Sequence, residues 1–176
     1  TLAEAAGQSK LNARAVELLS ARPMSRKELV DKLSAPARRR RKPGEDVPEP
    51  GPETLARERE SLRRGAEKAA DRLEELGLLN DGEYARTVVR HYSAKGYGVR
   101  KLRDELYRRG VPRELWEDAL AELEPDTSGI DRLLAQKLRG AEPTRENLKR
   151  ASDYLARRGF GWEEISAAIE RYRDGE

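Results

Sequence analysis

The chain has 176 residues, no cysteine, 39% charged residues and a formal net charge of only +3. The absence of cysteine excludes disulfides, thiolate metal sites and thiol chemistry. With 36% hydrophobic and 5% aromatic residues, the composition does not favour one deep core, but it suits thin cores between paired helices.

The sequence indicates neither a membrane segment nor a secretory leader. No stretch approaches the roughly twenty apolar residues that a transmembrane helix needs. The N-terminal residues 1–14 lack the apolar centre of a signal peptide. We therefore expect a cytoplasmic protein with no membrane partner.

The first third of the chain predicts helices around a linker. Leucine and alanine at helical spacing predict a first helix from Leu11 to Pro23. Ser25, three residues before Glu28, is typical of a capping box that begins a second helix. From Pro36 to Glu53 the periodicity stops and five of the nine prolines gather, so we expect a flexible linker.

The rest of the chain alternates helices with glycine stops. A helix from about Thr54 to Leu76 ends at Gly77, which is placed as a left-handed cap. Asn80 or Asp81 can cap the next helix. Later stops are predicted at the remaining breaks, Gly96, Gly98, Gly110, Pro125 and Gly159. Pro112 suits the first turn of a helix that runs to Leu123. No segment shows the alternation of a strand.

Internal repetition sets the predicted architecture. The segment LRDELYRRGVPRELWEDAL matches ASDYLARRGFGWEEISAAI, and SRKELVDKL matches GVRKLRDEL. We predict an all-α protein of three tandem three-helix repeats forming an elongated, curved molecule. The boundaries are 1–10 (extension), 11–80 (repeat 1, with the insertion at about 36–53), 81–125 (repeat 2) and 126–176 (repeat 3). Because one repeat is too small to bury its apolar stripe, neighbours are expected to share a core.

Basic residues gather in two places. Between Arg86 and Arg113 there are nine basic and two acidic residues, a local excess of seven positive charges. The linker carries a second cluster, Arg38, Arg39, Arg40, Arg41 and Lys42. Such fields attract phosphates or an acidic protein surface. The alternatives are a solvated helix face for the first cluster and a solubilising tract for the second.

The candidate binding residues recur between repeats. Basic residues flank the apolar Leu102 and Leu106 and are expected to be exposed, and Arg157 and Arg158 stand at the equivalent place one repeat later. The predicted binding set is Lys95, Tyr97, Arg100, Lys101, Arg103, Arg108, Arg109, Arg157 and Arg158, with the linker cluster as a possible DNA contact. The alternatives are cations that complement the helix macrodipole and a Tyr97 packed as a hinge instead of stacking on a base.

Catalysis has little support in the sequence. The single histidine, His91, has no indicated nucleophile partner and is expected at a surface or interface. There is no phosphate-binding loop, dinucleotide glycine motif or metal-ligand spacing, so no cofactor, metal or small-molecule substrate is predicted. Trp116 and Trp162 lie on or beside apolar stripes and are expected to be core or inter-unit anchors.

The sequence resembles the RecX family of bacterial recombinase regulators. The likeness rests on RLEELGLLNDGEYAR (72–86), KGYGVRKLRDELYRRGV (95–111) and ELLSARPMSRKELVDKL (17–33). The proline-rich linker departs from the family pattern, in which a tight turn and a short helix stand. The resemblance implies a non-enzymatic protein that binds the RecA filament on single-stranded DNA. It would lie in the filament groove and restrain ATP hydrolysis, strand exchange and co-protease action, with weak, phosphate-directed affinity for DNA.

Two other functions are compatible with the residues. Three-helix units resemble helix-turn-helix modules, which allows a free-standing DNA-binding protein, although no hairpin follows to form a wing. A helical scaffold for another protein partner is the third possibility.

Overall fold

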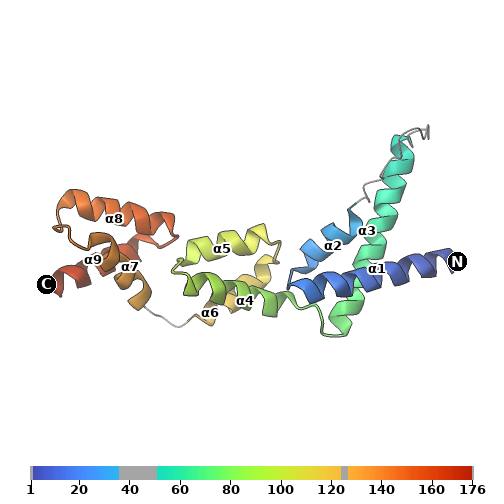
Figure 1. Ribbon diagram of the computed structural model, residues 1–176, viewed down its shortest axis with the longest axis horizontal. Coiled ribbons are helices and arrows are strands. Elements are labelled where there is room, and N and C mark those ends of the chain that lie inside the picture. Colours follow the sequence, from blue (N-terminus) through green and yellow to red (C-terminus); the bar gives the residue numbers. More distant parts are fainter. Residues whose placement is uncertain (1, 36–50, 124–126, 176) are drawn as a thin grey trace. The chain divides into compact units, whose positions relative to one another are not determined.

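The computed structural model describes residues 2–35, 51–123 and 127–175, which form helices and short connections (Figure 1). The helices are α1 (Leu2–Ala21), α2 (Arg26–Ser34), α3 (Pro52–Glu75), α4 (Asp81–Ala94), α5 (Val99–Arg108), the 3-10 turn η1 (Arg113–Leu115), α6 (Trp116–Ala121), α7 (Ser128–Leu138), α8 (Arg145–Arg157) and α9 (Trp162–Asp174). These ranges contain no strand, which confirms the all-α prediction. Nor do they contain a helix with both the length and the apolarity needed to cross a bilayer. The chain divides into two compact units, Thr1–Asp81 and Gly82–Glu176.

The first unit packs α1 and α2 against α3. Its buried core consists of Ala15, Met24, Leu29, Val30, Leu33, Ala66, Ala69, Ala70, Leu73 and Leu79. The alanines of α3 allow the neighbouring helices to approach closely. Ser25 caps α2 as expected, because its hydroxyl accepts a hydrogen bond from the Glu28 amide at 3.1 Å. Gly77 follows α3 in the left-handed conformation, with φ of 69°, also as expected.

Two helix starts differ from the sequence expectation. α1 begins at Leu2, so the residues assigned to an N-terminal extension belong to the first helix. α3 begins at Pro52, inside the predicted linker, because proline fits the first helical turn where an amide needs no partner. The rest of the linker, including the basic cluster Arg38, Arg39, Arg40, Arg41 and Lys42, lies outside the described residues.

Asp81 closes the first unit by binding the start of α2. Its carboxylate accepts a hydrogen bond from the Arg26 amide at 2.7 Å. The Arg26 guanidinium in turn pairs with Asp71 at 2.7 Å and with Glu74 at 3.1 Å. Burial raises the pKa of the Asp81 carboxyl above its usual 3.8, and the Arg26 amide and charge oppose this rise only in part. Asp81 was predicted as a possible cap for its own helix, whereas its carboxylate accepts this hydrogen bond from the α2 amide.

This raised pKa predicts a pH-dependent effect of Asp81→Asn. The folded protein holds the Asp81 proton more tightly than the unfolded chain, so this group favours folding most below pH 3.8 and loses that contribution as the pH rises through the folded pKa. Asparagine keeps an oxygen acceptor for Arg26 but has no charge to bury. We expect Asp81→Asn to gain stability relative to the unsubstituted protein between pH 3 and pH 7, measured by urea unfolding. A difference that is constant over this range, or falls, would contradict the assignment.

The second unit contains two hydrophobic clusters. α4, α5 and α6 enclose Tyr84, Ala85, Val88, Val89, Leu102, Leu106, Val111 and Ala119. α7, α8 and α9 enclose Ile130, Leu134, Leu138, Leu148, Ala151, Leu155, Phe160, Ile165 and Ala168. The clusters have no residue in common. The expectation that neighbouring repeats share a core of buried residues is therefore wrong for this pair, because each set of helices buries its own leucines, although the two sets are in contact at Gly96 and Leu133.

Equivalent glycines end α5 and α8. Gly110 (φ 68°) and Gly159 (φ 93°) are left-handed. At each stop, the next residue donates its amide back to the preceding turn: Val111 to the Leu106 carbonyl at 3.0 Å, and Phe160 to the Leu155 carbonyl at 3.2 Å. This is the hydrogen-bond pattern of a Schellman motif, which satisfies the last carbonyls of a helix. The paired Arg-Arg-Gly sequences thus encode the same helix end twice.

Two other expectations for this unit are wrong. Pro112 precedes the short 3-10 turn η1, and the helix α6 starts only at Trp116. It ends at Ala121 and does not reach Leu123, because residues 122 and 123 form a turn and a bend. Trp162 was expected to be a core or inter-unit anchor, yet it is 72% exposed. It is the first residue of α9, whose buried stripe is formed by Ile165 and Ala168.

Candidate nucleic-acid interface

The α5 helix separates an apolar face from a basic one. Leu102 and Leu106 are buried, while Arg100, Arg103 and Arg108 are exposed. Arg103 pairs with Glu117 of α6 at 2.9 Å. The expectation that the basic residues flanking this stripe are exposed is confirmed for Arg100 and Arg108, whereas it is wrong for Lys101, which is half-buried.

Glu105 forms ion pairs with three cations of α5 and its C-terminal end. This carboxylate is only 6% exposed. It lies 3.5 Å from the Lys101 ammonium, 3.2 Å from the Arg108 guanidinium and 3.6 Å from that of Arg109. A buried carboxylate is costly unless it is paired, so Glu105 needs cations around it. Part of the positive charge of α5 is therefore neutralised within the helix.

Arg109 is a packed residue, and the expectation that it is exposed is wrong. Its guanidinium donates to the Tyr84 hydroxyl at 3.0 Å and to the Tyr92 hydroxyl at 3.1 Å. Burial would lower the pKa of Arg109, but these two hydrogen bonds outweigh that effect and raise it above its usual value. Arg109 therefore stays charged at any pH at which the protein folds. Its donors are directed at the protein rather than at solvent.

Arg158 joins α8 to the turn before α5. Its guanidinium donates to the Gly96 and Lys95 carbonyls, at 3.1 Å each, and lies 4.7 Å from the centre of the Tyr97 ring. Its own carbonyl accepts the Gly98 amide at 2.9 Å. The neighbouring Tyr97 is half-buried, with one ring face covered by this guanidinium. Arg158 and Tyr97, which both belong to the predicted binding set, thus have a structural role.

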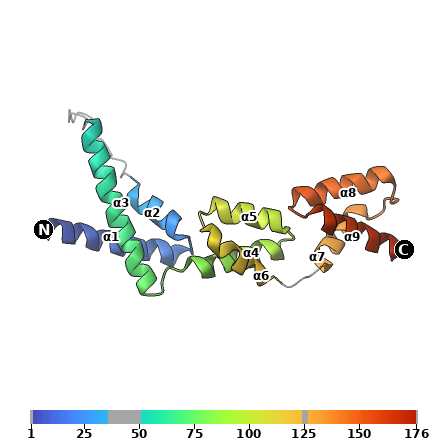
Figure 2. The same ribbon diagram turned by 180° about the vertical axis from the view of Figure 1, so that it is seen from behind.

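Backbone contacts complete this joint, which we call the α5–α8 junction (residues 95–101 and 157–160). The Arg100 amide donates to the Gly159 carbonyl at 3.1 Å. A Cβ atom on Gly98 would lie 2.5 Å from the Gly159 carbonyl, and one on Gly159 would lie 2.5 Å from the Lys101 amide. Only glycine fits at either position. The two views show the end of α8 beside the start of α5 (Figures 1 and 2).

Exposed cations surround the α5–α8 junction. Arg100 and Arg157 are exposed, and in the part of the chain that the structure describes neither forms an ion pair. Lys95 is also exposed, with its ammonium 5.6 Å from the centre of the Tyr92 ring. Residues that are distant in sequence therefore present positive charge from one fixed joint.

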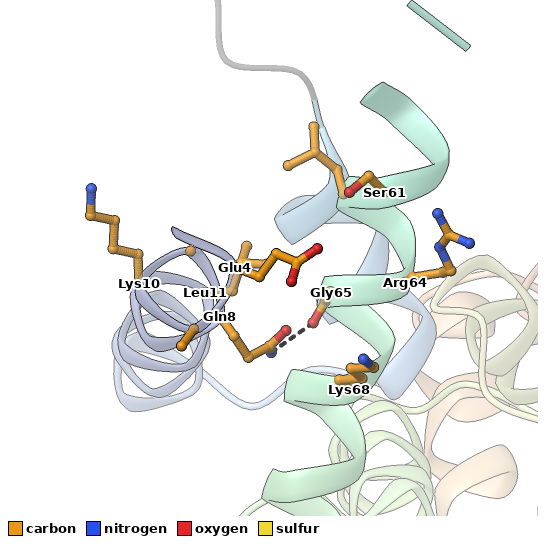
Figure 3. Close-up of a pocket in the computed structure, with 11 residues that line it drawn as sticks. Glu4, Gln8, Lys10, Leu11, Ser61, Arg64, Gly65 and Lys68 are labelled. Atoms are coloured by element: carbon orange, nitrogen blue, oxygen red, sulfur yellow. Dashed lines mark hydrogen bonds between the residues drawn. The ribbon is translucent and has the colours of Figure 1, made fainter. Parts of the chain in front are cut away.

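The first unit has an open groove of different character. It has a volume of about 1070 Å³ and lies between the N-terminal half of α1 and the middle of α3 (Figure 3). Gln8 donates across its floor to the Gly65 carbonyl at 3.0 Å. A Cβ atom on Gly65 would lie 2.7 Å from the Leu11 side chain, so this glycine allows α1 to approach α3 closely. The charged residues that line the groove are Glu4, Lys10, Arg64 and Lys68.

Sequence reasoning missed two residues of the second unit. Glu105 was treated only as one acid in a basic stretch, although its spacing from Lys101 and from Arg108–Arg109 is that of helical ion pairs. Trp162 was placed in a core because it lies beside an apolar stripe. Trp162 directly follows Gly161, shortly after the helix stop at Gly159. This position indicates instead the first, outward-facing turn of a helix.

The fold and the site define a class of helical proteins built from three-helix domains with basic surfaces. Comparison with known proteins identifies the family. A family model described as "RecX, second three-helix domain" matches residues 80–120. The regulatory protein RecX of Pseudomonas entomophila is 34% identical over 119 residues, which are 63% of this chain and 76% of that protein. The regulatory protein RecX of Salmonella paratyphi A is 30% identical over 169 residues, 94% of this chain and 93% of that protein. This chain belongs to the RecX family.

The solved structures agree in fold. The crystal structure of RecX from Lactobacillus salivarius has a TM-score of 0.74 to this chain, at 22% identity, covering 95% of this chain and 97% of that one. A second crystal structure, titled as regulatory protein RecX, has a TM-score of 0.71 at 20% identity, covering 96% of this chain and 74% of that one. The relatives in sequence are named as regulatory proteins rather than as enzymes.

Proposed function

We propose that this chain binds the RecA filament on single-stranded DNA and negatively modulates the ATPase, recombinase and co-protease activities of RecA. Membership of the RecX family supports a regulatory role. The observation that carries the proposal is the set of exposed cations at the α5–α8 junction, Lys95, Arg100 and Arg157. Cations held on a fixed frame suit the phosphates of a nucleoprotein filament. This function would place the chain in the cytoplasm, in DNA repair.

Geometry supports a phosphate-directed contact. The backbone hydrogen bonds of the junction fix Arg100 relative to Gly159, so the cations of two helices meet DNA without first ordering a loop. Preorganisation of this kind lowers the entropic cost of binding. The contacts carry no base-specific information, so the affinity for DNA alone should be weak and salt-sensitive.

ATP hydrolysis by RecA on single-stranded DNA tests this function. Adding the full chain in amounts below the RecA concentration should slow hydrolysis, because a filament-bound regulator acts on many subunits. Turnover that stays unchanged over a wide range of doses would contradict the proposal. Selection of a defined duplex sequence from random sites would instead favour the helix-turn-helix alternative.

Charge reversal at the junction tests the interface. We expect Arg100→Glu with Arg157→Glu to weaken filament binding at least tenfold, a loss of about 1.4 kcal/mol or more. The slope of log affinity against log salt should become shallower by about one for each lost phosphate contact. Binding is measured by anisotropy of labelled filaments, with circular dichroism to confirm helicity.

Arg150→Glu is the matched control. Arg150 lies on α8 like Arg157 and is 69% exposed, but it already pairs with Glu146 at 2.7 Å. Its reversal should change filament affinity less than twofold. Because the double variant reverses two charges and the control one, an equal loss of binding free energy per reversed residue would show that net charge, and not the junction, governs binding.

A further inference from the structure

We propose that Trp162 stacks on an unpaired base of single-stranded DNA while the cations of the α5–α8 junction hold the flanking phosphates. The inference deepens the proposed function and rests on it for the presence of DNA. It assigns the second unit a defined contact with a single strand, made by an aromatic ring and not by charge alone.

The exposure of Trp162 is unusual for its residue type. Tryptophan carries the largest apolar surface of any side chain and is normally well buried. Trp116 behaves in this way: it is half-buried in the α4–α6 cluster, and its indole nitrogen donates to the Val111 carbonyl at 3.0 Å. Trp162 is 72% exposed. A tryptophan left in solvent is a common mark of a binding hot spot.

The backbone beneath Trp162 is firmly held. Phe160, two residues earlier, is 9% exposed within the α7–α9 cluster. The Gly161 amide donates to the Glu164 carboxylate at 2.7 Å, which caps α9. The ring therefore projects from a fixed helix start and needs little ordering on binding.

Trp162 also lies close to the junction cations. The Gly159 carbonyl accepts the Arg100 amide at 3.1 Å, and Arg157 is the last residue of α8. Three residues of extended chain span at most about 11 Å, so the Trp162 backbone lies within that distance of Gly159. One tryptophan and two cations are thus presented from a single joint.

This combination fits a single strand better than a protein surface. Aromatic rings that take a base face, beside cations that follow the phosphates, are the general means of binding single-stranded nucleic acid. An apolar protein pocket would be matched by an apolar rim, whereas Trp162 is followed directly by the exposed Glu163, and the exposed Arg157 ends the preceding helix. Adjacent helical side chains diverge, so the Glu163 carboxylate and the Trp162 ring point to different sides.

Tryptophan fluorescence provides a direct test, since the chain has only two tryptophans. In the full chain carrying Trp116→Phe, emission reports Trp162 alone. Titration with oligothymidylate should quench this emission, and a matched strand of abasic sites should bind with the same salt slope but without quenching. Quenching by both strands, or by neither although the oligothymidylate binds, would overturn the proposal.

A second test measures affinity in the protein that keeps Trp116, so it does not depend on the Trp116→Phe variant. Trp162→Ala should weaken oligothymidylate binding about 5- to 150-fold, the equivalent of ~1–3 kcal/mol for one stacked base, with the salt slope unchanged. Trp162→Phe should restore most of the affinity. Tyr107→Ala is the control, because Tyr107 is 67% exposed but lies at the C-terminal end of α5, away from the junction residues at the start of that helix, and it should have no effect.

The outcomes separate this inference from the proposed function. If Trp162→Ala leaves oligothymidylate binding intact but weakens inhibition of RecA, the ring contacts protein; the stacking proposal then fails and the regulatory function stands. If stacking is observed but RecA hydrolysis is unaffected by the chain, the regulatory function fails and the single-strand site stands.

Discussion

Gly159→Ala is expected to destabilise the second unit by about 2–5 kcal/mol. A left-handed conformation costs a residue with a Cβ atom roughly 1–2 kcal/mol. The new Cβ would also lie 2.5 Å from the Lys101 amide nitrogen, where backbone must move, and overpacking of this kind adds roughly 1–3 kcal/mol. For a unit of this size we expect the midpoint of thermal unfolding to fall by more than about 8 °C.

Gly140→Ala separates the two contributions. Gly140 is also left-handed, with φ of 74°, but a Cβ atom there would meet nothing within 4 Å. It should lose only the conformational part, about 1–2 kcal/mol. Hydrogen exchange gives a local check: in Gly159→Ala the Gly98 and Arg100 amides should exchange much faster, and in Gly140→Ala they should not. Equal losses in the two variants would mean that the junction contributes nothing.

Arg109→Met is expected to destabilise the second unit by about 2–4 kcal/mol, because it removes one partner of a buried charge and both tyrosine contacts. Glu105, which is 6% exposed, would keep only Lys101 and Arg108. The Tyr84 hydroxyl would lose its donor in a side chain that is 7% exposed. Denaturant unfolding with an unchanged m value would show this as lost stability.

Arg108→Met is the control from the adjacent position. Arg108 pairs with the same carboxylate, but its side chain is 68% exposed, so its loss should change stability by no more than about 0.5 kcal/mol. For filament binding we expect the opposite order: Arg108→Met removes an accessible cation, so it should weaken binding more than Arg109→Met does. If Arg108→Met is the more destabilising substitution, then the assignment of Arg109 to the packed interior is wrong.

Local signals explain why so much of the fold could be predicted. Gly77, Gly110 and Gly159 all follow helices in the left-handed conformation, and Ser25 caps α2. These features depend on a few neighbouring residues, so the sequence shows them directly. Spacing of leucines likewise predicts which helix faces are buried.

The site was harder to predict because it depends on contacts between distant residues. Arg108 and Arg109 are neighbours in sequence, yet one is exposed and the other reaches Tyr84 and Tyr92 on α4. Arg158 repeats the sequence context of Arg109 but donates to the Gly96 carbonyl. No helical periodicity distinguishes an arginine that contacts solvent from one that contacts a carbonyl 62 residues earlier in the chain. The choice between DNA and protein as the partner of each free cation stays a prediction.

The α5–α8 junction also affects the order in which parts of the chain can fold during synthesis on the ribosome. The amides of Gly98, which precedes α5, and of Arg100, in the first turn of α5, donate to the carbonyls of Arg158 and Gly159, which lie about sixty residues later in the chain. While synthesis is incomplete, these donors face only water, and α5 lacks its final restraint. We therefore expect the start of α5 to gain these two hydrogen bonds only after residues 158 and 159 have been synthesised, so a nascent fragment that ends before them should hold this helix start less firmly.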